Sequence, residues 1–325
     1  MTLAESGILL HVGLTKTGTT TLQKTLFAGH SQVYYLGKLE PSKIPKGCRS
    51  MAVHDLLKRA LWQLKKPLDV KKTRNLYEEQ LLPEVLSGKL FVGSWEAFGM
   101  NATDKFTERL KRLQAIFGRC RIMVTLRNPL TWTPSEFLQN IEGHFLQRNH
   151  SWMGSVPFLD IEDWFEKRVK FSRGIHNFLS YSQNIQSAVS LLGRENVGIS
   201  LFEELKVNPE EYYHGICRFM GIDEKEGLQL SRQKHFNQRI SQQQIDFLRK
   251  VSTSWWWRVL IQRKSIKERR RLFQSIAEKH PDNAMPAKIS LTSRLEREIV
   301  AATREGNRWL VENLSLPLDK YNYPF

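Results

Sequence analysis

The chain has 325 residues, 41% hydrophobic and 25% charged, an ordinary composition for a soluble globular protein with one large α/β domain or two small ones. Its net charge of +16 is not ordinary, because 49 Lys and Arg residues face only 33 Asp and Glu residues. So large a surplus favours an anionic ligand or surface, such as a nucleotide, a nucleic acid, an acidic glycan or a lipid headgroup.

Cysteine content and hydropathy exclude other classes of protein. The three cysteines, Cys48, Cys120 and Cys217, are odd in number and unpaired in spacing, which indicates neither a disulfide framework nor a zinc site. Residues 1–7 are too few for a signal peptide, and no apolar run approaches the ~20 residues of a membrane span. The sequence therefore predicts a cytoplasmic protein, soluble or peripheral at the inner face of a membrane.

The first predicted strand, Ile8–Val12, leads into a loop that contains Gly13 and Gly18 and then into a helix. The two glycines match the G-x-x-x-x-G frame of a nucleotide-binding loop, in which backbone N–H groups and a helix N-terminus face an anion. In an NTPase a lysine follows the second glycine. Here Thr19 stands at that position, and the lysine is Lys16, two residues before the glycine.

A displaced lysine fits a donor with a short phosphate chain. The run from Lys16 to Gln23 resembles the 5′-phosphosulfate loop of sulfotransferases that use 3′-phosphoadenosine-5′-phosphosulfate (PAPS). The resemblance implies that Lys16 contacts the oxygen that bridges sulfur and phosphorus. It also implies that the 5′-phosphate is held by the backbone and hydroxyls of Thr17, Gly18, Thr19, Thr20 and Thr21.

Strands and helices alternate along the rest of the chain. Further strands are predicted at Val33–Leu36, Lys89–Gly93, Arg121–Leu126 and Val197–Leu201, and helices at Ala52–Lys65, Thr73–Ser87, Lys105–Phe117, Arg173–Leu192, Asn208–Met220 and from Ser293 onward. This alternation predicts an α/β fold, a three-layer sandwich with a central parallel sheet and a P-loop-like nucleotide-binding core. No Gly/Ser/Pro-rich linker interrupts it, so a single domain over residues 1–325 is expected.

Glu96 follows the third predicted strand, at the sheet edge where ligands bind in open α/β folds. Trp95 and Phe98 are expected to give it a partly apolar setting that raises its pKa into the range of a general base. A carboxylate near this place is the base in glycan-modifying sulfotransferases that the chain resembles, whereas cytosolic ones use a histidine. His144 and His150 are the competing bases. Alternatively, Glu96 caps the following turn or pairs with an arginine.

Arg127-Asn-Pro129 follows the strand Arg121–Leu126, and Ser135 comes eight residues after the arginine on a predicted helix. The pair resembles the 3′-phosphate motif of PAPS-dependent sulfotransferases and implies that Arg127 and Ser135 bind the 3′-phosphate of the donor. Many family members carry another arginine between these two positions, where this chain has Trp132. The alternative is a solvent-facing arginine followed by a helix-capping serine.

Two segments are predicted to lie apart from the nucleotide-binding core. Residues 143–174 are aromatic and mixed in pattern, as expected of an acceptor-binding insertion. Residues 249–285 are rich in tryptophan and basic residues, with nine basic and one acidic residue from Arg249 to Arg271. The part from Trp255 to Arg271 reads as a basic amphipathic element that lies on an anionic membrane or guides a polyanionic acceptor. A core-docked helix with a solvated basic face is the alternative.

The predicted function is transfer of the sulfuryl group of PAPS to a hydroxyl or amine of an acceptor, a carbohydrate or glycolipid, without a metal ion. A P-loop-type nucleotide or small-molecule kinase is one alternative, but it would need Mg²⁺ ligands and a lysine after Gly18. Another is a non-catalytic basic protein that binds membrane or nucleic acid, although no nucleic-acid-binding motif is present. The motifs leave the acceptor open among glycan, lipid, peptide tyrosine and small metabolite.

Overall fold

The computed structural model describes residues 7–39, 51–80, 82–83, 88–100, 102–147, 151–153, 158–232, 240–278 and 286–325, so Cys48 and His150 lie outside the described residues. The chain groups into two compact units. The first consists of Met1–Asn128, Leu179–Phe236 and Glu305–Asn322, and the second of Pro129–Phe178, Asn237–Arg304 and Tyr323–Phe325. A single domain over residues 1–325 stays a prediction.

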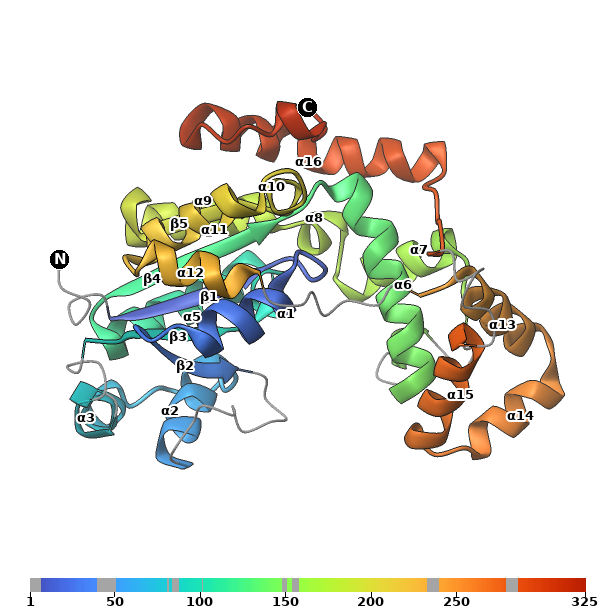
Figure 1. Cartoon of the computed structure of the whole chain (residues 1–325), viewed down its shortest axis with the longest axis horizontal. Coiled ribbons are helices and arrows are strands. Elements are labelled where there is room, and N and C mark those ends of the chain that lie inside the picture. The colour runs from blue at the N-terminus through green and yellow to red at the C-terminus, as the bar shows by residue number, and fades with distance from the viewer. Residues whose placement is uncertain are drawn as a thin grey trace. The chain divides into compact units, whose positions relative to one another are not determined.

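The first unit is built on a five-stranded sheet in the order β2-β3-β1-β4-β5, with every strand parallel to its neighbours (Figure 1). The strands are β1 (Ile8–Gly13), β2 (Val33–Lys38), β3 (Leu90–Ser94), β4 (Cys120–Leu126) and β5 (Val197–Leu201). All residues of β1 and β3 are buried, because helices cover both faces of a parallel sheet. The predicted α/β fold with a central parallel sheet is confirmed.

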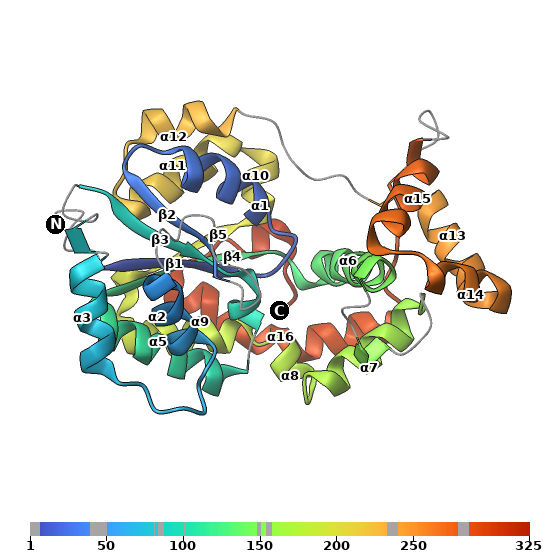
Figure 2. The same cartoon turned by 90° about the horizontal axis from the view of Figure 1, so that it is seen from below.

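Helices pack on both faces of this sheet (Figure 2). One face carries α1 (Thr19–Leu22), α10 (Phe202–Val207), α11 (Pro209–Met220) and α12 (Glu224–Ser231); the other carries α2 (Met51–Leu61), α3 (Val70–Gln80), α5 (Thr103–Phe117) and α9 (Tyr181–Leu192). On the first face, buried Leu9 and Met123 of the sheet pack with Leu22, Ile216 and Met220 of the helices. The predicted helix after the phosphate loop is α1 followed by one wider turn, the π-helix η2 (Gln23–Phe27).

One predicted helix is wrong in its extent. The stretch Arg173–Leu192 forms two helices, α8 (Ile175–Phe178) and α9, and Arg173 lies outside both. Arg173 and Gly174 have φ angles of 61° and 125°, which a right-handed helix does not allow, and they separate α8 from α7 (Ile161–Phe171).

The second unit is helical over most of its described residues. It contains α6 (Pro129–Gln147), η4 (Ser151–Met153), α7, α8, α13 (Gln242–Thr253), α14 (Trp255–Arg263), α15 (Ile266–Glu278) and the first half of α16 (Ser293–Leu314). Its core is aromatic: Phe137, Trp164, Phe165 and Phe178 are buried against one another. Residues 143–174 are therefore partly core, and their role in acceptor binding stays a prediction.

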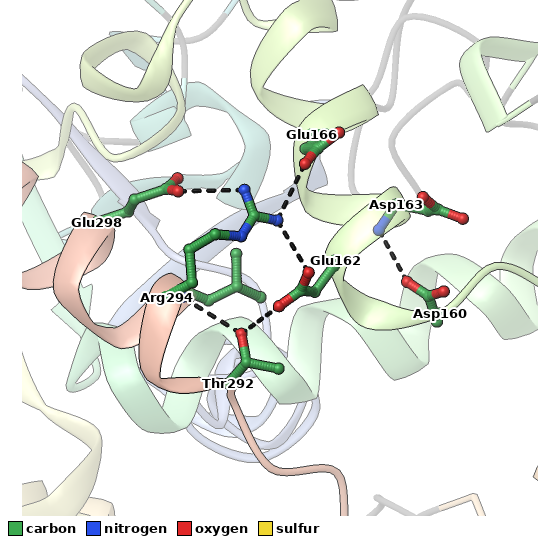
Figure 3. Close-up of polar contacts among 8 residues, drawn as sticks. Asp160, Glu162, Asp163, Glu166, Thr292, Arg294 and Glu298 are labelled. Atoms are coloured by element: carbon green, nitrogen blue, oxygen red, sulfur yellow. Dashed lines mark hydrogen bonds and ion pairs between the residues drawn. The ribbon is translucent and has the colours of Figure 1, made fainter.

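A cluster of charged side chains joins α7 to the start of α16 within this unit (Figure 3). Arg294 donates to Glu162 Oε2 (3.1 Å) and to Glu166 Oε1 (2.9 Å) on α7, and to Glu298 Oε1 (3.3 Å) on its own helix. The hydroxyl of Thr292 also donates to Glu162. These contacts from Thr292 and Arg294 hold the pKa of Glu162 below its usual value. The cluster fixes the start of α16, so Arg294 has a structural role.

Candidate active site

The phosphate loop begins where β1 ends, at Gly13, and packs closely on the neighbouring strand β4. A Cβ atom at Gly13 would lie 2.3 Å from the carbonyl oxygen of Thr125, and the φ angle of Gly13 is 143°, so only glycine fits. Leu14 N–H donates to the same carbonyl at 3.0 Å. At the other end of the loop, Gly18 (φ 79°) is the N-cap of α1. Glycine has no side chain that could cap the N–H groups at the start of this helix. The sequence predicts that these N–H groups face an anion, and that role stays a prediction.

The threonines of the loop divide into different roles. The Thr17 hydroxyl is fully buried, donates to Leu14 O (2.7 Å) and lies 2.8 Å from Thr125 Oγ1, so it holds the loop in shape. Thr21 is also buried. The hydroxyl of Thr19 hydrogen-bonds to Glu96, whereas Thr20 is half-buried.

Lys16 and Arg127 are joined through the backbone of the loop. Lys16 is half-buried, has a φ angle of 58° and accepts a hydrogen bond on its carbonyl from Arg127 Nη1 at 3.2 Å. The guanidinium of Arg127 also lies over the ring of Phe202, 4.9 Å from its centroid. The arginine of the second motif therefore contacts the loop of the first.

Asn128, which the sequence did not single out, fixes the backbone next to this arginine. Its side chain donates to the carbonyls of Tyr321 (3.1 Å) and Asn322 (2.7 Å), and its N–H donates to Glu203 (3.0 Å). Ser135 lies on α6 in the second unit, so its pairing with Arg127 stays a prediction from the motif. Trp132, at the position of the absent arginine, is fully buried on the ring of Phe178 and serves as core.

Glu96 is buried at the start of η3 (Glu96–Met100), in a polar network next to the loop. Gln23 Nε2 donates to Glu96 Oε1 at 3.0 Å and to Ser94 Oγ at 2.8 Å. Lys38 Nζ, from the end of β2, lies 3.1 Å from Glu96 Oε1. The loop residue Thr19 supplies a further hydrogen bond, so four side chains, counting that of Ser94, connect Glu96 to the loop helix and to the strands.

The pKa of Glu96 is lowered, contrary to the sequence prediction. Burial is the largest single effect and would raise this pKa, but the charge of Lys38 and the hydrogen bonds from the backbone, from Thr19 and from Lys38 together outweigh it. The prediction considered burial but not the polar partners that surround the carboxylate; the ring of Trp95 packs on Trp62 at 4.1 Å. Glu96 is therefore ionised at neutral pH, which is the form that accepts a proton.

His11 is a buried member of the network that the sequence analysis missed. Its Nδ1 lies 2.8 Å from Ser94 Oγ, and its ring packs edge-on against Phe27 at 5.1 Å. Burial lowers the pKa of His11 to about 4, although the charge of Glu96 opposes this shift. The ring is thus neutral at physiological pH. Because His11 lies within an apolar strand run, no local pattern indicated this polar connection.

Of the two competing bases, His144 belongs to the described part of the chain and is buried on α6 in the second unit. Among the described residues, no group of three or more His, Cys, Asp or Glu side chains could hold a metal ion. No helix in the described ranges is long and apolar enough to cross a membrane.

The chain is similar to several solved structures at low sequence identity. Solved structures similar to it include the sulfotransferase domain of the curacin biosynthetic pathway (18% identity, 92% of this chain and 96% of that chain, TM-score 0.45). A sulfotransferase from Alicyclobacillus acidocaldarius is 17% identical over 67% of this chain and 82% of its own, with a TM-score of 0.42. Mouse sulfotransferase SULT7A1, complexed with PAP, is 15% identical over 71% of this chain and 66% of its own, with a TM-score of 0.37. Among curated proteins no match was found.

The family match includes both motifs, the phosphate loop and the segment with Arg127. The family described as "Sulfotransferase domain" matches residues 8–280, a span that includes Lys16, Glu96 and Arg127. Since this span is most of the chain, and the fold is the expected one, the chain belongs to the sulfotransferase domain family.

Proposed function

We propose that this sulfotransferase moves the sulfuryl group of PAPS to a hydroxyl or amine of a carbohydrate or glycolipid acceptor. The observation that carries the proposal is the phosphate loop with two attached groups. Arg127 donates to the carbonyl of Lys16, and the ionised Glu96 is hydrogen-bonded to Thr19 at the start of the loop helix. A cation proposed for the 3′-phosphate of the donor and a base proposed for the acceptor proton thus adjoin one loop.

In the proposed reaction the acceptor oxygen or nitrogen forms a bond to sulfur while the bond from sulfur to the phosphate oxygen breaks. Lys16 meets the charge that grows on that bridging oxygen, and Glu96 takes the proton of the acceptor. The loop from Thr17 to Thr21 holds the 5′-phosphate through its backbone. Among its threonine hydroxyls, that of Thr20 also contacts this phosphate, because Thr20 is half-buried and is not bonded to Glu96. Arg127 with Ser135 binds the 3′-phosphate.

The acceptor class and the compartment are proposed from charge and chemistry. A net charge of +16 fits an acidic glycan or a glycolipid headgroup better than a neutral metabolite. Cys120 and Cys217 are free and buried, which fits a cytoplasmic site. Incubating cell extracts with the protein and labelled PAPS, followed by mass spectrometry, would identify the acceptor.

The proposal is tested first by donor selectivity. Adenosine 3′,5′-bisphosphate should raise the melting temperature much more than ATP at equal concentration, because Arg127 and Ser135 require a 3′-phosphate. At a hundred times its Kd, a ligand stabilises the folded state by about 2.7 kcal/mol, which a thermal scan detects.

Arg127→Ala should remove most of this stabilisation, whereas Arg74→Ala, an exposed arginine on α3, should not. Equal stabilisation by ATP would contradict the assignment of the donor and favour a kinase.

A further inference from the structure

Helix α14 exposes large apolar side chains. Trp255, Trp256 and Leu260 are 59%, 71% and 52% exposed. On the opposite side of the helix, Ile261 is buried and Trp257 packs edge-on against Phe247 of α13 at 6.2 Å. The alternative of a core-docked helix therefore accounts for only one side of α14.

Trp255 and Trp256 are placed by a regular helix start. The hydroxyl of Ser254 accepts a hydrogen bond from the N–H of Trp257, so Ser254 caps α14. The two exposed rings contact each other edge to face, 4.6 Å apart. Residues four apart lie on one face of a helix, so Leu260 extends the exposed side of Trp256.

Exposed basic side chains follow this apolar side along the chain. The exposed ones between α14 and the first turns of α15 are Arg263, Lys264, Lys267, Arg270 and Arg271. The single acidic residue of the segment, Glu268, accepts hydrogen bonds from the N–H (2.7 Å) and hydroxyl (2.6 Å) of Ser265 and so caps α15. Ile266, between them, is 48% exposed.

Unlike the other basic residues of α15, Arg269 does not face solvent, and it attaches α15 to α6. It is buried and donates to the carbonyl of Phe145 on α6 at 2.9 Å. Phe145 and Phe273 pack together at 5.4 Å behind it. Helix α15 is therefore anchored by Arg269 and Phe273, while the basic residues around Ile266 point to solvent.

We propose that the exposed residues from Trp255 to Arg271, here called the Trp255–Arg271 surface, bind the headgroup region of an anionic lipid bilayer. Tryptophan rings prefer the boundary between lipid and water, and lysine and arginine side chains are attracted to anionic headgroups. A soluble polyanion would use the basic side chains but would leave Trp255, Trp256 and Leu260 exposed to water. The bilayer uses both, and this inference is independent of sulfuryl transfer.

The experiment is sedimentation of the full chain with vesicles of phosphatidylcholine, with and without phosphatidylglycerol, at low and at high salt. Two variants separate the contributions: Trp255→Ser with Trp256→Ser, and Lys264→Gln with Lys267→Gln and Arg271→Gln. Phe171→Ser, an aromatic residue on α7 that is 58% exposed, is the control for apolar area, and Lys71→Gln with Lys72→Gln on α3 is the control for charge.

The unmodified protein should sediment with phosphatidylglycerol vesicles at low salt. The tryptophan variant should lower the bound fraction at least about tenfold, the charge variant should remove the preference for phosphatidylglycerol, and both controls should bind normally. Stabilisation by adenosine 3′,5′-bisphosphate, unchanged in the variants, reports that they are folded. The proposal is overturned if the unmodified protein does not sediment, or if the tryptophan variant binds as well as the unmodified protein.

Discussion

At the scale of single residues, the ion pair of Lys38 and Glu96, 3.1 Å apart, bears most directly on the proposed general base. A buried carboxylate without a partner would be protonated, since burial disfavours its charged form. Lys38, whose own side chain is 39% exposed, contributes the largest of the effects that lower the pKa of Glu96, and hydrogen bonds contribute the rest. In its proposed role as base, Glu96 is therefore a weak base that is ionised at neutral pH.

Replacing Glu96 with Gln should lower turnover roughly 10²–10⁴-fold, because the amide keeps the shape but accepts no proton. Donor affinity should hardly change. The measurement is steady-state kinetics together with the thermal shift by adenosine 3′,5′-bisphosphate. Retained activity in Glu96→Gln, with loss in His144→Ala or His150→Ala, would show that the base is a histidine.

The pH profile follows from the lowered pKa of Glu96. The rate should stay level down to about the ordinary glutamate value of 4.5 and fall only below it, as Glu96 becomes protonated. In Lys38→Gln burial is no longer opposed by a nearby cation, so this fall should move to higher pH. Lys38→Arg keeps the charge and should keep the unmodified profile. An identical profile in Lys38→Gln would separate Lys38 from the base.

Lys16→Ala should lower kcat by about 10²–10³-fold, as does loss of one group that stabilises a developing negative charge. Donor binding should weaken less, because this charge grows only in the transition state. Lys24→Ala, an exposed lysine one helical turn beyond the loop, is the control. An unchanged kcat would remove Lys16 from the mechanism.

At the scale of elements, the position of the loop depends on how closely β1 approaches β4. Gly13 packs against the backbone of Thr125. A Cβ atom added at Gly99 of η3 would lie only 3.0 Å from the backbone nitrogen of Gly13. Three backbone segments, β1, β4 and η3, therefore meet at one residue that has no side chain. This packing brings Glu96, at the start of η3, next to the loop.

Gly13→Ala should destabilise the fold by roughly 1–3 kcal/mol, because the added methyl group overlaps Thr125 and the φ angle disfavours alanine. Gly215→Ala is the matched control. Gly215 lies within α11, is exposed, and a Cβ atom there meets nothing within 4 Å. This substitution should stabilise the protein by roughly 0.5–1 kcal/mol through helix propensity. Urea denaturation measures both, and equal effects of the two would contradict the argument.

At the scale of the whole molecule, the positive charge is unevenly distributed. The 23 residues from Arg249 to Arg271 carry nine basic and one acidic side chain, and so half of the net charge of +16. Of these, Arg269 is used inside the fold. The others are half-buried or exposed. A local surplus of this size fits a surface that binds an anionic partner, and solubility alone would not require it.

Activity should persist in EDTA, because the proposed reaction needs only the charge of Lys16 and Arg127 around the donor phosphates. Assays with and without EDTA, with and without added Mg²⁺, measure this directly. A strict requirement for Mg²⁺ would contradict the proposed reaction and support a kinase.

The sequence by itself determined the elements that depend on local pattern. Apolar runs such as Ile8–Val12 specify buried parallel strands, and the loop from Gly13 to Gly18 is recognisable because its glycines satisfy backbone requirements within a few residues. The loop and the arginine after β4 were predicted at this level, and both lie within residues 8–280, which the family matches.

Only the tertiary structure decided the ionisation of Glu96 and the exposure of α14. The partners of Glu96 are Lys38, 58 residues earlier, and Gln23, 73 residues earlier, and no local pattern indicates that they meet. For α14 the sequence allowed a core helix or a surface helix, because both have the same amphipathic pattern. Packing with α13 left Trp255 and Trp256 outside, since a helix can bury only the side that its neighbours cover.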